Sequence, residues 1–549
     1  MKTCKQCSVD FEITDSDRVF YAKMNVPEPL LCPDCRQQRR WAFRNQSKLY
    51  KRKCDLTGEE MVSLYSPDKP YKVYKESAWW SDQWDPLSYG RDFDFSRPFF
   101  EQMGELLLAV PRRGMHQDGT NENCEYTTFG ASNKNSYMLL AGFYCEDVYY
   151  STWTGMTKNS MDTLLCVNGG RAYECTDCDN CYECFYCHDS KNCQNSWMLE
   201  NCKRLKSCIA CKNLTDKEYY IYNQPASKAD FEAMQKRLLE GYLAEEMKKF
   251  NQWKLQFPYC CVHSEQSENC SGDYFQNAKN CHDCFDVPMG AQDCSHCQMS
   301  GWGGKDLMDC TMVGKECELL YFMQATTTAY HSAFTNFCRY SSDVFYCDCV
   351  SACKDCFGCT GLRHKSYCLL NKQYSREEYE RLLQRVIEHM KKTGEWGEFF
   401  PPHLSQFGYN ETMAMEYFPL AKEEALKSGF KWSDYEPPAI KAKKMIPARR
   451  LPDTITNTPD DVLNWAILCE ATQKPFKIIA QELKFYREMG LPIPHLHPDE
   501  RHRRRMALRN PRKLYDRACM KCKKPIVTTY APDRPEIVYC ENCYLKEIY

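Results

Sequence analysis

The stretch DCDNCYECFYCHDSKNCQNS, residues 177–196, decides the fold of the middle of the chain. Cysteine returns here at short intervals, and Cys178, Cys193 and Cys208 follow one another in steps of fifteen residues. Asn and Asp precede short alternating segments, a pattern typical of the turns between β-solenoid strands. Small apolar thiols suit the narrow interior of such a fold. The sequence therefore predicts a multidomain, mainly β protein built on a cysteine-rich β-solenoid.

A duplication divides this middle region into two halves. KEYYIYNQPASKADFEAM (217–234) aligns with KSYCLLNKQYSREEYERL (365–382), and both stretches pass from an alternating pattern into a helical one. Each contains a pair that resembles a capping box, Ser227 with Asp230 and Ser375 with Glu378. We therefore expect two half-solenoids, each ending in a helix that covers its open edge.

A second duplication joins the two ends of the chain. CPDCRQQRRWAFRNQSKLYKRKC (32–54) matches HPDERHRRRMALRNPRKLYDRAC (497–519), and residues 4–74 align with 469–539 without a gap. Each copy contains two ribbons in series, of which one keeps all of its cysteines. The intact ribbons are formed by Cys4, Cys7, Cys32 and Cys35 near the start of the chain and by Cys519, Cys522, Cys540 and Cys543 near its end.

Two CxxC pairs at this separation provide four thiolates and no open position, which is the ligand set of structural zinc. The sequence thus predicts two structural Zn²⁺ ions per chain, with a rubredoxin-like iron site as the alternative. The other two ribbons have lost ligands. One retains only Cys54; the other has Cys469, Thr472, His497 and Glu500. Cys469, His497 and Glu500 offer a third set of metal ligands, but Thr472 is a poor ligand for soft metals, which favours a relic.

Arginine is concentrated beside the ribbons in both copies. Arginine forks with aromatic neighbours suit phosphates and unpaired bases, and these segments are the strong positive patches of the chain. They predict binding to RNA, ribosomal RNA included, or to other nucleic acid, without sequence preference. The alternative is a solvated helix whose arginines pair with local acids. The candidate contacts are Arg36, Arg39, Arg40, Arg44, Arg501, Arg504, Arg505 and Arg509.

The central cysteines support a further alternative. Cys175, Cys178, Cys181, Cys184 and Cys187 lie at every third residue, and CxxCxxC is how ferredoxin motifs begin. The ferredoxin ending, a further Cys followed by Pro, is missing, which favours buried inert thiols over an iron–sulfur or redox protein. No GxSxG, HExxH, P-loop or GxGxxG context is present, so we expect a non-enzymatic protein. A protein-interaction scaffold built on the solenoid is the remaining alternative.

The length, net charge and apolar segments of the chain limit these interpretations. The chain has 549 residues and a formal net charge of −2, so no overall field attracts it to nucleic acid or membrane. It begins without an apolar signal core and contains no run long enough to span a bilayer, which predicts a cytoplasmic protein without membrane contact. The expected units are an N-terminal zinc-ribbon module (1–78), a helical linker (79–119), two half-solenoids (120–258 and 259–394), a linker (395–460) and a C-terminal zinc-ribbon module (461–549).

Taken together, the chain resembles zinc-ribbon-containing, cysteine-rich proteins of candidate-phyla bacteria. The resemblance rests on CKQCSVDF with CPDCRQQRR near the start, on YCLLNKQYSREEYE in the middle, and on LRNPRKLYDRACMKCKKPIVTTYAPDRPEIVYCENCY near the end. It covers most of the chain. It implies a setting and no particular activity.

Overall fold

The computed structural model describes residues 1–117, 119–287, 290–299, 304–311, 318–321, 323–324 and 327–548. Helix accounts for 27% and strand for 25% of the chain, and the strands among these residues form ten separate sheets, most of them small. Within these described ranges no closed or solenoid sheet is found. The prediction of a mainly β solenoid is therefore wrong: the molecule is a mixed α and β protein. Short bends interrupt the pairing too often for one continuous sheet to form.

The middle of the chain instead forms two ladders of parallel β-pairs. In the first ladder each residue of a parallel pair meets the residue twelve positions further on, as Tyr173 meets Phe185 and Trp197 meets Ile209. The last two strands of this ladder pair antiparallel, Tyr220 with Pro225 and Ile221 with Gln224. Its strands are β7 (Glu146–Tyr149), β8 (Lys158–Met161), β9 (Tyr182–Phe185), β10 (Gln194–Glu200), β11 (Ile209–Lys212), β12 (Tyr220–Ile221) and β13 (Gln224–Pro225).

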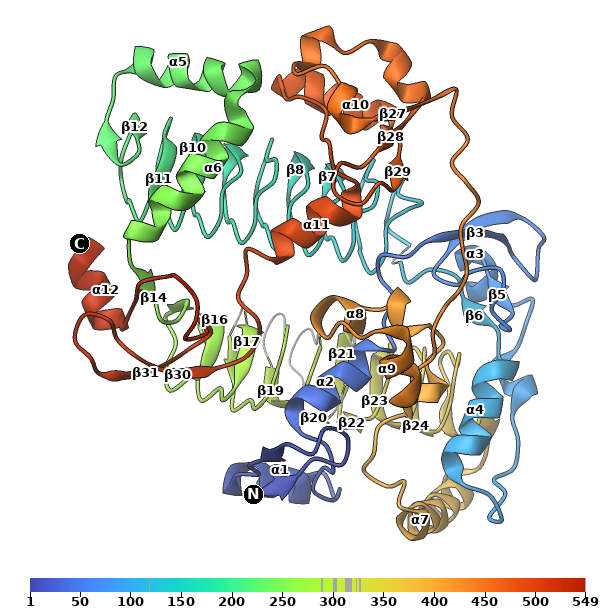
Figure 1. The fold of residues 1–549 in the computed structure, drawn as a ribbon. Coiled ribbons are helices and arrows are strands. Elements are labelled where there is room, and N and C mark those ends of the chain that lie inside the picture. Colours follow the sequence, from blue (N-terminus) through green and yellow to red (C-terminus); the bar gives the residue numbers. More distant parts are fainter. Residues whose placement is uncertain are drawn as a thin grey trace.

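The second ladder repeats this arrangement with the same spacing in most pairs, for example Cys356 with Cys368. Its strands are β15 (Ser264–Glu265), β16 (Gly272–Gln276), β17 (Cys284–Val287), β18 (Ala291–Gln292), β19 (Gly304–Met308), β20 (Glu318–Tyr321), β21 (Thr327–Tyr330), β22 (Ser332–Ala333), β23 (Arg339–Phe345), β24 (Lys354–Phe357), β25 (Ser366–Leu369) and β26 (Lys372–Gln373). Figure 1 shows the two ladders one above the other, the first in teal and green and the second in yellow.

A three-residue unit explains both ladders. Nearly every third residue of the first ladder has a positive φ, and Asn and Asp, which tolerate that conformation, recur at these positions. The next residue points inward and is often cysteine. The Cys178 thiol donates to the Thr176 carbonyl at 3.3 Å and to the Cys187 carbonyl at 3.5 Å. A small side chain with a weak donor therefore fits the interior. The fifteen-residue step in the sequence is one twelve-residue repeat plus one such unit.

Helices lie at the ends of the ladders, as the capping pairs predict. The first ladder leads into α5 (Lys228–Arg237) and α6 (Leu243–Trp253), and the second into α7 (Arg376–Thr393). Ser227 and Ser375 accept from the N3 amides, and the N3 carboxylates accept from the cap amides, so both capping boxes are confirmed. Tyr379, Val386 and Met390 form the buried face of α7, which packs against β25.

The two terminal modules contain the same elements in the same order. The N-terminal module has β1 (Lys2–Thr3), β2 (Asp10–Phe11), α1 (Asp15–Lys23), α2 (Pro33–Trp41), β3 (Tyr50–Lys53), β4 (Glu60–Ser63), β5 (Val73–Tyr74) and α3 (Glu76–Trp80). The C-terminal module has β28 (Trp465–Leu468), β29 (Pro475–Phe476), α10 (Ala480–Met489), α11 (Pro498–Met506), β30 (Tyr515–Ala518), β31 (Pro525–Thr528), β32 (Val538–Tyr539) and α12 (Glu541–Ile548). The sequence duplication is therefore also a structural one.

Each module is joined to the chain segment that enters a ladder. β5 pairs in parallel with β6 (Arg112–Arg113), which precedes the first ladder, and β32 pairs in parallel with β14 (Tyr259–Cys260), which precedes the second. The remaining α-helices and strands of the described residues are α4 (Phe99–Ala109), α8 (Met413–Tyr417), α9 (Lys422–Lys427) and β27 (Lys444–Pro447). The two largest hydrophobic cores each join one end of the chain to the more distant ladder. In one core, N-terminal residues pack with the second ladder, and in the other, C-terminal residues pack with the first.

Candidate metal centres and the contacts that position them

The N-terminal tetrad brings together Cys4, Cys7, Cys32 and Cys35. Their ligand atoms lie within 4.8 Å of one another, and the Sγ atoms of Cys7 and Cys32 are 3.7 Å apart. Four sulfurs about 2.3 Å from a tetrahedral ion are separated by about 3.8 Å, so the group has the right size for one ion. The Cys32 amide donates to Cys4 Sγ at 3.3 Å. Hydrogen bonding with Cys35 lowers the pKa of Cys32 to about 5, which favours the thiolate that metals bind.

The C-terminal tetrad has matching geometry and greater exposure. Cys522 Sγ and Cys540 Sγ are 3.7 Å apart, and the Cys540 amide donates to Cys519 Sγ at 3.2 Å. Burial opposes ionisation of Cys519, yet the backbone amides of Cys522 and Cys540 lower its pKa to about 6. Here only Cys519 is buried, whereas three of the four N-terminal thiols are. Both groups of cysteines predicted as ligands are thus assembled in the fold.

The degenerate ribbons keep the shape of a metal knuckle without its ligands. The residue after each CxxC-type turn has a positive φ in all four ribbons: Ser8, Gly58, Gln473 and Lys523. The Lys75 amide still donates to Cys54 Sγ at 3.2 Å, as the Cys32 amide does to Cys4. Among the described residues, Cys469, His497 and Glu500 do not form a group with ligand atoms within 4.8 Å. The Glu500 carboxylate accepts from Arg503 at 2.7 Å instead.

Two arginine side chains on each arginine-rich helix point into the molecule. In α2, Arg36 and Arg40 both lie against Asp309 of the second ladder, at 2.5 and 3.5 Å. In α11, the equivalent Arg501 and Arg505 lie against Asp162 of the first ladder, at 3.1 and 2.9 Å. All four arginines and both aspartates are buried. Each helix is therefore fixed to a ladder by two arginines that share one buried aspartate.

The other four candidate arginines include two with buried side chains and two that are more exposed. Arg44 is buried with its guanidinium 3.9 Å from the centroid of the Phe129 ring, and Arg509 pairs with Asp177 and with Asp286. Arg39 has a side chain 15% exposed and pairs with Glu398, while Arg504 is 58% exposed.

Six of the eight arginines predicted to contact nucleic acid thus have buried side chains. Five of them pair with acidic residues of the ladders that lie far away in the sequence, and Arg44 packs against the Phe129 ring of the first ladder. These six, Arg36, Arg40, Arg44, Arg501, Arg505 and Arg509, have little or no exposed side chain that a phosphate could contact.

The CxxCxxC cysteines line the interior of the first ladder. Cys175, Cys178, Cys181 and Cys184 are buried, and each donates to a backbone carbonyl two residues earlier. None of them belongs to the groups, within the described part of the chain, whose ligand atoms lie within 4.8 Å of one another. Spacing every third residue reflects the three-residue unit of the ladder.

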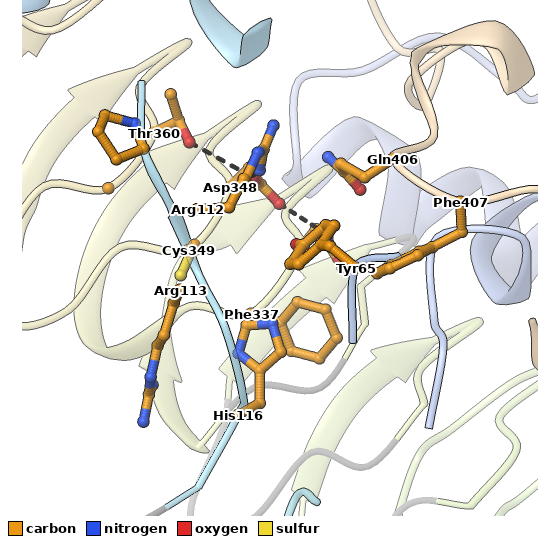
Figure 2. A pocket seen from close by; sticks show the side chains of 13 residues that line it. Tyr65, Arg112, Arg113, His116, Phe337, Asp348, Cys349, Thr360, Gln406 and Phe407 are labelled. Atoms are coloured by element: carbon orange, nitrogen blue, oxygen red, sulfur yellow. Dashed lines mark hydrogen bonds and ion pairs between the residues drawn. The ribbon is translucent and has the colours of Figure 1, made fainter. Parts of the chain in front are cut away.

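Two cavities accompany these contacts. Figure 2 shows the smaller, where Arg112 of β6 and Thr360 both donate to Asp348 beside the stacked rings of Tyr65 and Phe407. It measures about 10 Å³, room for about one water molecule, so it is part of a buried junction. The larger measures about 790 Å³.

Both ladders and the C-terminal module line the larger cavity. Sequence reasoning did not find it, because its walls are distant in the chain. Its lining includes Phe143, Trp153 and Met156 of the first ladder, Tyr274, Phe275 and Met299 of the second, and Leu508, Tyr530 and Tyr544 of the C-terminal module. In Figure 1, α11 lies between the two ladders, and the chain continues from it toward β30 and β31 of the C-terminal module.

Comparison with protein-family models and with curated proteins gives no match. The fold and the sites define a cysteine-rich protein of mixed α and β structure, with two Cys4 groups that can each hold a metal ion. Within the described ranges, no helix has both the length and the apolar character needed to cross a membrane.

Proposed function

We propose that this is a non-enzymatic binding protein in which two structural Zn²⁺ ions stabilise the terminal modules, and these modules hold the two ladders around the larger cavity. The observation that carries the metal assignment is the 3.7 Å sulfur spacing in both tetrads. Four thiolates leave no position for substrate, so each ion has a structural role. Zinc suits a closed tetrahedral thiolate set and adds no redox chemistry.

Metal quantification together with absorption spectroscopy tests the metal assignment. Protein purified without oxygen should contain two thiolate-bound zinc ions per chain and show no visible absorption. Iron in the same thiolate sites would colour the protein, and that result would contradict the zinc assignment.

The binding role rests on the cavity. Its volume of about 790 Å³ lies within the range of about 300–1,000 Å³ that is usual for small-molecule sites. Aromatic and aliphatic side chains make up much of its wall, and Lys191, Glu200, Lys254 and Glu265 add charged groups. Such a lining fits an organic molecule with an apolar body and a polar end.

A cavity-filling substitution tests this role. Ala507 is an exposed residue at the end of α11 and lines the cavity, so Ala507→Trp should reduce its volume. We expect native mass spectrometry of the full chain to detect a bound small molecule in the parent protein and much less in this variant. Ala229→Trp, at an exposed position on α5, is the matched control and should retain the molecule. Equal retention in both variants would contradict binding in the cavity.

A further inference from the structure

A cluster of histidine and aspartate that shares no residue with either tetrad lies on the wall of the larger cavity. Asp177, His188 and Asp189 of the first ladder place their ligand atoms within 4.8 Å of one another. Asp177 and Asp189 are twelve residues apart, so the ladder repeat stacks them, and His188 precedes the second of them. His263, at the start of the second ladder, approaches from the other side, and all four residues line the cavity.

The distances in this cluster are longer than those of ordinary hydrogen bonds. His188 Nε2 lies 3.4 Å from Asp189 Oδ2 and 3.8 Å from Asp177 Oδ2, and His263 Nε2 lies 3.5 Å from Asp189 Oδ2. Elsewhere in the molecule, His–Asp pairs that hydrogen-bond are closer: His296 and Asp283 are 2.9 Å apart.

A gap of this size fits a metal ion. Nitrogen and oxygen ligands about 2.0–2.1 Å from a tetrahedral ion are separated by about 3.3–3.4 Å, close to the shorter distances in the cluster. His188 Nε2 is buried and has no hydrogen-bond partner among the described residues. An ion between these atoms would satisfy this nitrogen.

Neighbouring residues orient the ligands as the surroundings of a metal site do. Asp273 accepts from the backbone amide of His263 at 2.7 Å and contacts its Nδ1 at 2.9 Å, which leaves Nε2 directed toward Asp189. Thr529 of the C-terminal module donates to Asp273 at 2.6 Å. A carboxylate on the far nitrogen of a ligating histidine is the usual means of fixing its ring.

The charges around the cluster also favour a cation. Asp177, Asp189, Asp273 and Asp286 converge here, and the arginines that pair with them are Arg509 and Arg512. Arg509 pairs with Asp177 and Asp286, and Arg512 pairs with Asp286. Asp189 has only long contacts with His188, His263 and Tyr274 as its side-chain partners in the described structure. The arginines among these side chains are thus fewer than the carboxylates.

We infer that Asp177, His188, Asp189 and His263 form a third metal site, for a divalent transition ion such as Zn²⁺, which ties the two ladders together at the cavity wall. Imidazole and carboxylate ligands suit zinc and similar ions. The inference is independent of the tetrads, which use sulfur. It is also independent of a small-molecule ligand, although a ligand in the cavity could reach the ion.

Metal counting on the full chain tests the site. The parent protein, loaded with Zn²⁺ and freed of excess metal, should hold three ions per chain, and His188→Ala should hold two. His296→Ala removes a histidine that hydrogen-bonds Asp283 and does not line the cavity, so it should still hold three. A parent protein with two ions, both thiolate-bound, would overturn the inference.

Cobalt separates failure of this site from failure of the tetrads. Co²⁺ bound by four thiolates gives intense sulfur-to-metal charge-transfer absorption, whereas Co²⁺ bound by nitrogen and oxygen does not. His188→Ala should lose one Co²⁺ and keep the thiolate absorption unchanged. A cobalt-loaded parent protein without thiolate absorption would instead contradict metal binding by the tetrads. If His188→Ala fails to fold, His263→Gln provides the same comparison, and three ions retained in that variant would overturn the inference.

Discussion

The two terminal modules share every element and differ in which ribbon can hold metal. The N-terminal module keeps the ribbon whose last two cysteines lie at the start of its arginine-rich helix, and the C-terminal module keeps the ribbon that follows this helix. Both keep the two arginines that reach a buried ladder aspartate. Each module therefore folds with one of its two ribbons able to hold metal, and that ribbon differs between the modules. The arginine contact, in contrast, lies at the same place in both modules. The repeated feature is the attachment of a module to a ladder.

The modules also differ in how well their arginines are neutralised. Asp309 is the carboxylate that Arg36 and Arg40 share. In the C-terminal module, Glu482 adds a contact to Arg501 and Glu174 adds one to Arg505, beside the shared Asp162. In both modules two arginines therefore share one ladder aspartate, and in the C-terminal module two glutamates add further contacts.

Removing a tetrad ligand should have the largest effect. Binding of structural zinc contributes about 10–16 kcal/mol to small zinc domains, so Cys32→Ser and Cys540→Ser should each lose one zinc and destabilise their module. We expect Cys32→Ser to lower the melting temperature more, because Cys4, Cys32 and Cys35 belong to the main core and the C-terminal ligands are more exposed. Zinc counts and thermal unfolding measure this.

The same difference in burial predicts the order of zinc release. A chelator should remove zinc from the C-terminal tetrad of the parent protein first. The two serine variants identify which tetrad releases its zinc. Faster release from the N-terminal tetrad would contradict the expectation that the more exposed tetrad loses zinc first.

Removing a shared aspartate should have the next largest effect. Both aspartates have positive φ values, which asparagine tolerates, so Asp309→Asn and Asp162→Asn change charge with little backbone strain. Asp309→Asn should cost about 3–5 kcal/mol, because two buried arginines lose the carboxylate that they share. Asp162→Asn should cost less, about 1–3 kcal/mol, because Glu482 and Glu174 remain. Denaturant unfolding measures both.

Asp293→Asn is the matched control for this pair. Asp293 also has a positive φ but is exposed, so its replacement should change the free energy of unfolding by less than about 0.5 kcal/mol. Equal losses for Asp309→Asn and Asp162→Asn would show that the extra glutamates do not matter.

Restoring a lost ribbon should have a moderate effect. Thr57→Cys, Lys75→Cys and Ala78→Cys together complete a tetrad with Cys54, whose backbone already has the knuckle shape. The triple variant should bind one more zinc than its parent and melt at a higher temperature when zinc is present. The variant with Thr57→Cys and Lys75→Cys alone, which has three thiols, should bind that zinc more weakly. No gain in zinc would show that the degenerate ribbon has lost more than its ligands.

Replacing an exposed arginine should have the smallest effect. Arg504 is 58% exposed and pairs with Glu500 on the same helix, so Arg504→Ala should change the free energy of unfolding by less than about 0.5 kcal/mol. Arg505→Ala, its buried neighbour, should cost several times more because Asp162 loses a partner. An RNA-binding titration at several salt concentrations on Arg504→Ala would detect any contribution from this exposed side chain.

Local patterns could be predicted where neighbouring residues determine them. The capping boxes at Ser227 and Ser375 depend on residues three apart, and the cysteine tetrads depend on fixed spacings within each ribbon. The ladders were harder. The sequence shows cysteines at every third residue, but the twelve-residue pairing and its frequent bends became visible only in the backbone, which is why a continuous solenoid sheet was wrongly expected.

The sequence by itself determined the duplication, the two tetrads and the position of the arginine-rich segments, because each is a pattern within a short segment or an alignment of two segments. Only the tertiary structure decided what the arginines do. Asp309 lies 273 residues from Arg36, and Asp162 lies more than 300 residues before Arg501, so no local pattern indicates either contact. Burial of a charge requires an opposite charge nearby, and which one the fold supplies depends on packing between distant segments.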